Sequence, residues 1–182
     1  AKNIYLEDHP ETNIHVIDSL SAGGEVDLLV DKLNELIEQG LSFDEVVQAI
    51  TTYQEKTKLL FVLAKVDNLV KNGRLSKLIG TVVGLLNIRM VGEASKTGTL
   101  ELLQKARGPK KSLQAAYEEL VKAGYAGGRI IMAHRSNEKF CQQLSELILE
   151  TFPQADIKIL GTSGLCSFYA EDGGLLMGYE IN

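Results

Sequence analysis

Short apolar runs alternate along this chain with amphipathic segments of helical spacing. Apolar residues recur at three- and four-residue intervals over 26–37, and Gly40 follows as a natural helix end. Residues 59–63 form a continuous apolar run that is short enough for a buried strand. The whole pattern predicts seven strands and about six helices, which is typical of the α/β or α+β class.

Capping and turn signals predict the other elements of the first half. Ser42 and Glu45 form a capping box at the start of a second helix. A short helix is expected over 66–72, and a nearly all-apolar helix is expected over 77–86. Two strands, over 88–93 and 99–105, flank a Ser-Lys-Thr-Gly turn and predict a β-hairpin.

The part of the chain after Gly108 has a strand–helix–strand–helix–strand order. Pro109 suits the first turn of one helix, and Ser136 is expected to cap another that ends near residue 152. Strands are expected over 129–134, 157–160 and 175–181, with a long loop over 161–174. We expect residues 1–87 to be the remainder of an N-terminal α/β domain with helical segments, and 88–182 to be a C-terminal α/β domain with a mixed sheet.

Composition narrows the class of protein. The 182 residues carry a formal charge of −5 and show no basic stripe, which argues against sequence-independent nucleic-acid binding. No segment approaches eighteen continuous apolar residues, so no membrane span is expected. The polar N-terminus does not resemble a signal peptide. Cys141 and Cys166 have no paired spacing and indicate reduced thiols of a cytoplasmic protein.

The turn after residue 17 is the first candidate site. An apolar strand over 14–17 is expected to enter the Ser19–Gly23 turn, and a helix follows at once. The hydroxyls of Ser19 and Ser21 and the unpaired N–H groups of a helix start favour a phosphate or carboxylate there. Taken alone, this stretch is more typical of a turn with a helix cap.

Other loops offer further candidate groups. Arg107, followed by Lys110 and Lys111, lies at a helix start where cations oppose the dipole, so an anionic ligand and a solvated basic surface are equally open. For Arg74, capping of helix carbonyls is the favoured reading. Tyr169 lies in the predicted long loop. The chain has no metal-ligand spacing, phosphate loop or nucleophile elbow, so the residues alone do not mark it as an enzyme.

Several stretches occur in an order that resembles the DegV family of bacterial fatty-acid-binding proteins, some of which are the acyl-binding subunit of fatty acid kinase. These stretches are VIDSLSAGG, KLLFVLAKVDNLVKNGRLS, LNIRMVGEASKTGTLELLQKARGPKKSL and FYAEDGGLLMGYE. Each motif has little specificity alone, but together they cover nearly all of the chain in the family's order. The resemblance implies a non-catalytic, lipid-binding protein that presents a long-chain fatty acid to a separate ATP-dependent kinase. It implies no cofactor beyond that ligand.

The resemblance also implies roles for particular residues. Ser21 would hydrogen-bond the acyl carboxylate, with Ser19, Gly23 and Tyr169 also at the ligand. Arg107 would supply the balancing charge, and Arg74 would lie at the mouth, where the family meets its kinase. An apolar tunnel would run between the two domains, lined partly by the helix over 78–86.

Two departures from the family pattern qualify this reading. A Thr-Ser-Gln-Pro motif that family members carry before these stretches is absent, so the chain is expected to correspond to the C-terminal two-thirds of such a protein. Tyr169 stands where a His is common in the family. Two alternatives stay open: a phosphotransferase related to dihydroxyacetone kinases, and a regulatory domain with a different small ligand.

Overall fold

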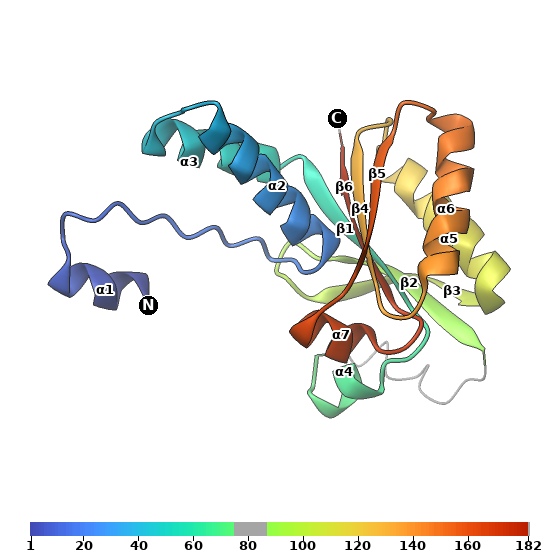
Figure 1. The fold of residues 1–182 in the computed structure, drawn as a ribbon. Helices are drawn as coiled ribbons and strands as arrows, with labels where there is room; N and C mark the ends of the chain where they lie inside the picture. Colours follow the sequence, from blue (N-terminus) through green and yellow to red (C-terminus); the bar gives the residue numbers. More distant parts are fainter. Residues whose placement is uncertain (75–86, 182) are drawn as a thin grey trace.

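The computed structural model describes residues 1–74 and 87–181 (Figure 1). The described strands are β1 (Thr57–Leu63), β2 (Ile88–Ala94), β3 (Leu100–Arg107), β4 (Arg129–His134), β5 (Asp156–Gly161) and β6 (Leu175–Glu180). The described helices are α1 (Lys2–Asp8), α2 (Gly24–Glu38), α3 (Phe43–Gln54), α4 (Asp67–Lys71), α5 (Gly108–Lys122), α6 (Glu138–Thr151) and α7 (Gly164–Ala170). The expected helix over 77–86 lies outside the described residues.

The six strands form one mixed sheet in the order β3-β2-β1-β6-β4-β5. β4 and β5 run parallel, and every other neighbouring pair is antiparallel. This confirms the mixed α/β fold class. The sheet continues across the boundary expected near residue 87, because β1 pairs with β2. The two-domain division stays a prediction, and a boundary at residue 87 would cut through this sheet.

The two faces of the sheet have different covers. On one face α5 and α6 bury the larger apolar cluster, which includes Val62, Leu144 and Met177 (Figure 1). On the other face β1 presents Leu59, Phe61 and Leu63 toward α4 and α7. This alternation along β1 follows the period of two in a strand. α5 and α6 do not cover the second face, which leaves room for a site there.

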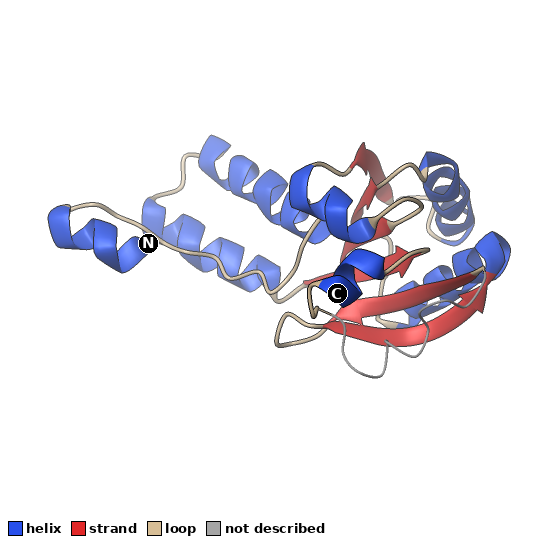
Figure 2. Cartoon of the chain, turned by 90° about the horizontal axis from the view of Figure 1, so that it is seen from below, coloured by secondary structure: helices blue, strands red, loops and turns tan. Residues whose placement is uncertain are grey.

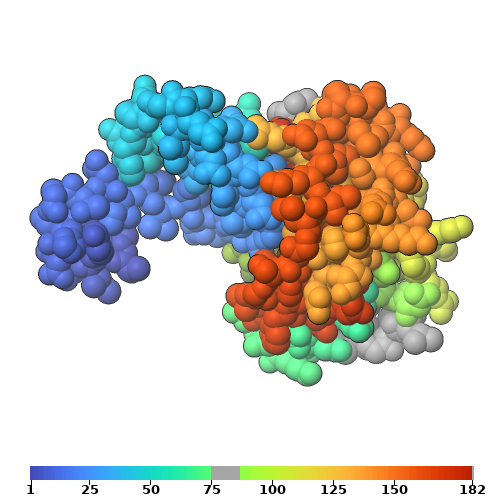
Figure 3. Space-filling view, in the orientation of Figure 1, coloured from blue at the N-terminus to red at the C-terminus, as the bar shows by residue number. Residues whose placement is uncertain are grey.

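α2 and α3 form a helical hairpin that projects from the sheet, as the view from below shows (Figure 2). Leu29, Leu36 and Ile50 are buried between them. Ser42 begins α3 as expected: its backbone N–H donates to the Glu45 carboxylate at 2.8 Å. α1 buries no residue, and the blue atoms at the N-terminus form a lobe apart from the sheet (Figure 3).

Three sequence expectations are wrong. Residues 14–17 are extended but form no strand, because no described strand pairs with them, and Val16 stays 62% exposed. The N-cap of α6 is Asn137 rather than Ser136, whose φ is +50°. The expected loop over 161–174 contains α7. Because 14–17 forms no strand, the described residues hold six strands rather than the expected seven.

Candidate functional site

An apolar cavity of about 610 Å³ opens on the face of the sheet that α5 and α6 leave uncovered. Its walls come from β1, β6, α4, α7 and the turn between β2 and β3. They include Leu59, Phe61, Leu63, Leu69, Leu100, Cys166, Ala170 and Leu176. The volume lies in the range of small-molecule sites, which are usually lined by apolar side chains with a few polar groups. The cavity therefore suits an apolar ligand.

Arg74 and Tyr169 supply the polar groups that line this cavity near α4 and α7. The Arg74 guanidinium lies over the Tyr169 ring, 4.9 Å from its centroid, so the two side chains are held together by a cation–π contact. Tyr169 lies on α7 rather than in a loop, which corrects the expectation. The structure thus brings together two of the predicted site residues.

The α4–α7 end of the site is held by Asn68. Its backbone N–H donates to Glu171 Oε1 at 2.8 Å, and its side-chain amide donates to the Phe168 carbonyl at 2.8 Å. The two helices lie side by side at the lower end of the molecule (Figure 3). These bonds fix Tyr169 relative to Arg74, which follows α4 directly.

The predicted Ser19–Gly23 turn reaches the same cavity through Ala22. Gly23 has a φ of +57°, and a Cβ there would lie 2.7 Å from Leu176 Cβ, so a side chain has no room. Leu176 itself lines the cavity. The close approach of Gly23 therefore seats the turn against the cavity wall. Asp18 accepts the Leu20 N–H at 3.3 Å, which is the turn role expected for an Asp here.

The Ser21 hydroxyl is already hydrogen-bonded to a buried carboxylate, that of Glu25. It donates to Glu25 Oε2, and the Thr57 hydroxyl donates to Glu25 Oε1 at 2.8 Å. Ser19 accepts the Ser21 N–H at 3.3 Å and lines a second, more polar cavity of about 830 Å³. Leu59 lines both cavities, so they are neighbouring parts of one face.

Arg107 lies away from these groups. It is the exposed N-cap of α5, at the opposite end of β3 from Gly98, which lines the apolar cavity. At roughly 3.3 Å per residue, β3 separates its two ends by about 23 Å. Lys110 and Lys111 are exposed beside it. The structure therefore does not bring Arg107 together with Ser21 or Tyr169.

His134 and Cys141 are two other side chains of reactive types close to the sheet, and both have structural roles. His134 Nδ1 accepts the Asn137 N–H at 3.2 Å, so the imidazole supports the start of α6. Burial raises the pKa of the Cys141 thiol to about 12, which keeps it protonated and unreactive. Both cysteines are free thiols. Among the described residues, no group of three or more His, Cys, Asp or Glu side chains could hold a metal ion.

Sequence reasoning missed most of the residues that line this site, among them Ala22, Phe61 and Leu176, and it missed Glu25 beside Ser21. Phe61 and Leu176 reach the cavity through strand pairing across the sheet, since they are register partners on β1 and β6. Pairing between strands this far apart in the chain leaves no signal in the local sequence. Glu25 had one, because it stands at the start of the expected helix, four residues after the candidate Ser21.

A mixed α/β fold with an apolar cavity on one sheet face is typical of small-molecule-binding proteins. Comparison with known proteins identifies the family: the model of the DegV family, described as uncharacterised proteins, matches residues 1–180. The chain belongs to the DegV family. This confirms the resemblance found in the sequence.

Relatives from streptococci are close in sequence. A DegV domain-containing protein of Streptococcus pneumoniae is 88% identical over all 182 residues, and one of Streptococcus gordonii is 77% identical over 181 residues. The chain spans 65% of the first protein's length and 64% of the second's.

Two solved structures share the fold closely. The Streptococcus pneumoniae Fatty Acid Kinase (Fak) B3 protein loaded with linoleic acid has a TM-score of 0.97 and 88% identity, and the match covers all of this chain and 65% of that one. A DegV family protein from Eubacterium eligens loaded with heptadecanoic acid has a TM-score of 0.94 and 37% identity, and the match covers 100% of this chain and 66% of that one.

None of the helices described here is long and apolar enough to cross a membrane.

Proposed function

We propose that this chain binds a long-chain fatty acid and presents its carboxyl group to a separate ATP-dependent kinase in the cytoplasm, without catalysing the transfer itself. The observation that carries the proposal is the apolar cavity beside the Ser19–Gly23 turn and Tyr169. Relatives loaded with linoleic and heptadecanoic acid, one of them a fatty acid kinase B3 protein, support both the ligand class and the partner.

The tail supplies most of the affinity in this proposal. Burial of a methylene group contributes about 0.8 kcal/mol, so a sixteen-carbon chain has roughly 12 kcal/mol to offer before the costs of binding. Phe61, Leu63 and Leu176 are the walls that would receive it. The head group then has to be oriented rather than tightly held.

Polar residues at the cavity orient the head group. Ser21 and Tyr169 carry hydroxyls that hydrogen-bond a carboxyl group, and Ser19 and Gly23 shape the turn that holds Ser21. Arg74 balances the charge at the mouth, since a guanidinium stays ionised. Arg107 is assigned to the encounter with the kinase, because it is exposed at the far end of β3.

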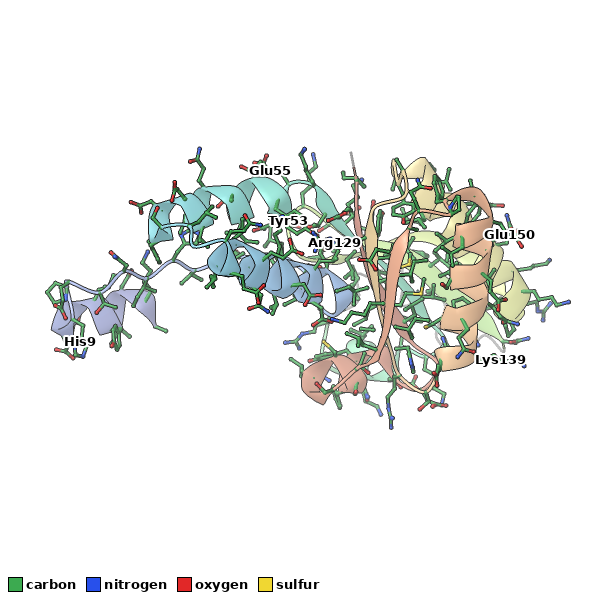
Figure 4. All side chains as sticks on the ribbon, turned by 45° about the horizontal axis from the view of Figure 1, so that its top comes forward. His9, Tyr53, Glu55, Arg129, Lys139 and Glu150 are labelled. Atoms are coloured by element: carbon green, nitrogen blue, oxygen red, sulfur yellow. The ribbon has the colours of Figure 1, made fainter. Side chains whose placement is uncertain are left out.

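Organic extraction of the purified full-length protein, followed by mass spectrometry, tests the ligand class. One long-chain fatty acid per protein is the expected result. Cys166→Phe fills the cavity from α7 and is expected to lower the fatty acid content at least about tenfold. Lys139→Phe adds the same side chain at an exposed position of α6 and is expected to leave it unchanged (Figure 4). Wild-type protein that carries no lipid, and takes up none when offered it, would contradict the proposal.

A further inference from the structure

Glu25 is a buried carboxylate that the proposed function does not use. It stands in the first turn of α2 with 6% of its surface exposed. Both of its oxygens accept hydrogen bonds from hydroxyls, one from Ser21 and one from Thr57 at 2.8 Å. No described Lys or Arg forms an ion pair with it. Two hydroxyl donors and the helix start are therefore its partners.

The backbone around Glu25 leaves the carboxylate little freedom to move away. Gly24 and Gly178 meet closely where α2 packs on the sheet: a Cβ on Gly178 would lie 2.2 Å from the Glu25 backbone nitrogen. A Cβ on Gly24 would lie 2.0 Å from the Ile131 carbonyl oxygen. The helix start is thus fixed against β4 and β6, and it holds the Glu25 side chain next to Ser21.

The Ser21 hydroxyl can donate to only one acceptor at a time. A serine hydroxyl has one proton to donate, and Ser21 donates it to Glu25. An ionised carboxylate ligand offers acceptors only, so it cannot take that proton while Glu25 holds it. With Glu25 ionised and accepting this hydrogen bond, Ser21 offers a ligand only its acceptor lone pairs. A head group that accepts the Ser21 proton therefore takes that bond from Glu25, unless Glu25 or the ligand takes up a proton of its own.

We infer that Glu25 is a positioning residue for the head group, and that binding of a fatty acid at Ser21 is coupled to the uptake of one proton. The proton comes from the solvent and lies on Glu25 or on the ligand carboxyl. In either place it completes the hydrogen bonds among Glu25, Ser21 and the ligand. This inference rests on the proposed function, because it requires Ser21 to meet the head group.

Other charged side chains lie around Glu25, and the test has to separate their effect from that of Glu25. The charged side chains that line the same polar cavity as Glu25 are Glu55, Lys58, Glu93, Lys96 and Glu101, from the C-cap of α3, β1, β2, the hairpin turn and β3. Tyr179 of β6 is buried nearby, and burial followed by the charges of Glu93 and Glu25 raises its pKa, so it stays neutral. None of these groups hydrogen-bonds Ser21, so a control can be drawn from among them.

Calorimetric titration of the full-length protein with palmitic acid, in phosphate and in Tris buffer, measures proton uptake directly. The wild type is expected to take up about one proton per fatty acid, and its Kd to rise about tenfold per pH unit above neutrality. Glu25→Gln is expected to take up none: its amide donates to Ser21, which frees the serine proton for the ligand carboxylate. Glu55→Gln removes the same charge without that bond and is expected to keep the uptake (Figure 4).

Each outcome decides the inference. Fatty acid binding by the wild type without proton uptake would overturn the role of Glu25 and leave the proposed function standing. Equal loss of uptake in Glu25→Gln and Glu55→Gln would overturn it as well. Absence of binding at every pH would overturn the proposed function and the inference with it. If Glu25→Gln fails to fold, Ser21→Ala serves instead and is expected to bind more weakly with no proton uptake.

Discussion

Tyr53 joins the helical hairpin to the sheet through one hydrogen bond. Its hydroxyl donates to Glu180 Oε1 at 2.7 Å, and it lies near Arg129 where α3 approaches the sheet (Figure 4). A hydrogen bond to a charged group contributes about 1.5 kcal/mol, so Tyr53→Phe is expected to lower the free energy of unfolding by about that amount in urea denaturation. Tyr5→Phe, on exposed α1, is the control and is expected to change it by less than about 0.5 kcal/mol. Equal effects of the two variants would contradict this role.

Glu35 makes the stability of the protein depend on acid pH. Its hydrogen bond with Arg129 is the main cause that holds the pKa of this carboxyl below its usual value of 4.5. A carboxyl with a lowered folded-state pKa stabilises the fold above its unfolded-state pKa, and this contribution is lost as pH falls through the folded-state value. The wild type is therefore expected to lose stability below about pH 4.5.

Urea midpoints at acid and at neutral pH test this dependence. Glu35→Gln is expected to show a smaller difference between the two midpoints than the wild type. Glu38→Gln, on an exposed position of the same helix, is expected to behave like the wild type. A difference in midpoints that is the same in all three proteins would show that Glu35 is not a source of the acid sensitivity.

Single residues were predictable from the sequence where their partners are local. Ser42 and Glu45 stand three residues apart, and both belong to the capping box that the sequence indicates. Asn137 replaces Ser136 as the N-cap of α6 because its side chain donates to the Gly173 carbonyl, 36 residues away. The Glu35–Arg129 pair spans 94 residues. Sequence pattern contains no information about partners at such separations.

The packing of α2 on the sheet depends on two glycines that face each other. A Cβ on Gly24 would lie 2.0 Å from the Ile131 carbonyl oxygen and 2.7 Å from the Gly178 nitrogen, both of them backbone atoms that cannot rotate away. Gly24→Ala is expected to lower the free energy of unfolding by about 3 kcal/mol, because the helix must shift from β4 and β6.

Chemical denaturation of Gly24→Ala and Gly161→Ala together checks this packing. A Cβ on Gly161, at the end of β5, would meet no atom within 4 Å, so that variant is expected to change stability by less than about 0.5 kcal/mol. Wild-type stability of Gly24→Ala would mean that α2 does not approach the sheet as closely as this structure has it.

Elements with a strong apolar pattern were predicted well. β1 is a continuous apolar run, and the β2–β3 hairpin flanks a Gly-containing turn, so both follow from residues close in sequence. Three of the four residues over 14–17 are apolar, yet no strand forms, because a strand needs a neighbour to pair with. α7 has only seven residues, too few for a helical period to be visible in the sequence.

The candidate site was only partly predictable because it is assembled from distant segments. The turn at Ser21 and the residues Arg74 and Tyr169 were chosen from sequence, and all three contribute to one face of the sheet. Their common location follows from the strand order, which places β6 and α7 beside β1. Arg107 was expected beside Ser21, but β3 places it at the opposite end of the hairpin. The proposed head-group and partner contacts are therefore separable by mutation.

Arg107 provides the test of the proposed kinase contact. The side chain is exposed, lies at the start of α5 and has no ion-pair partner among the residues described. Loss of one partner of an interfacial charge pair costs roughly 2 kcal/mol or more, so Arg107→Ala is expected to slow acyl-phosphate formation by the kinase at least about 30-fold per bound fatty acid. Lys105→Ala removes an exposed charge from the same strand and is the control. A wild-type rate in Arg107→Ala would end its assignment to the kinase contact.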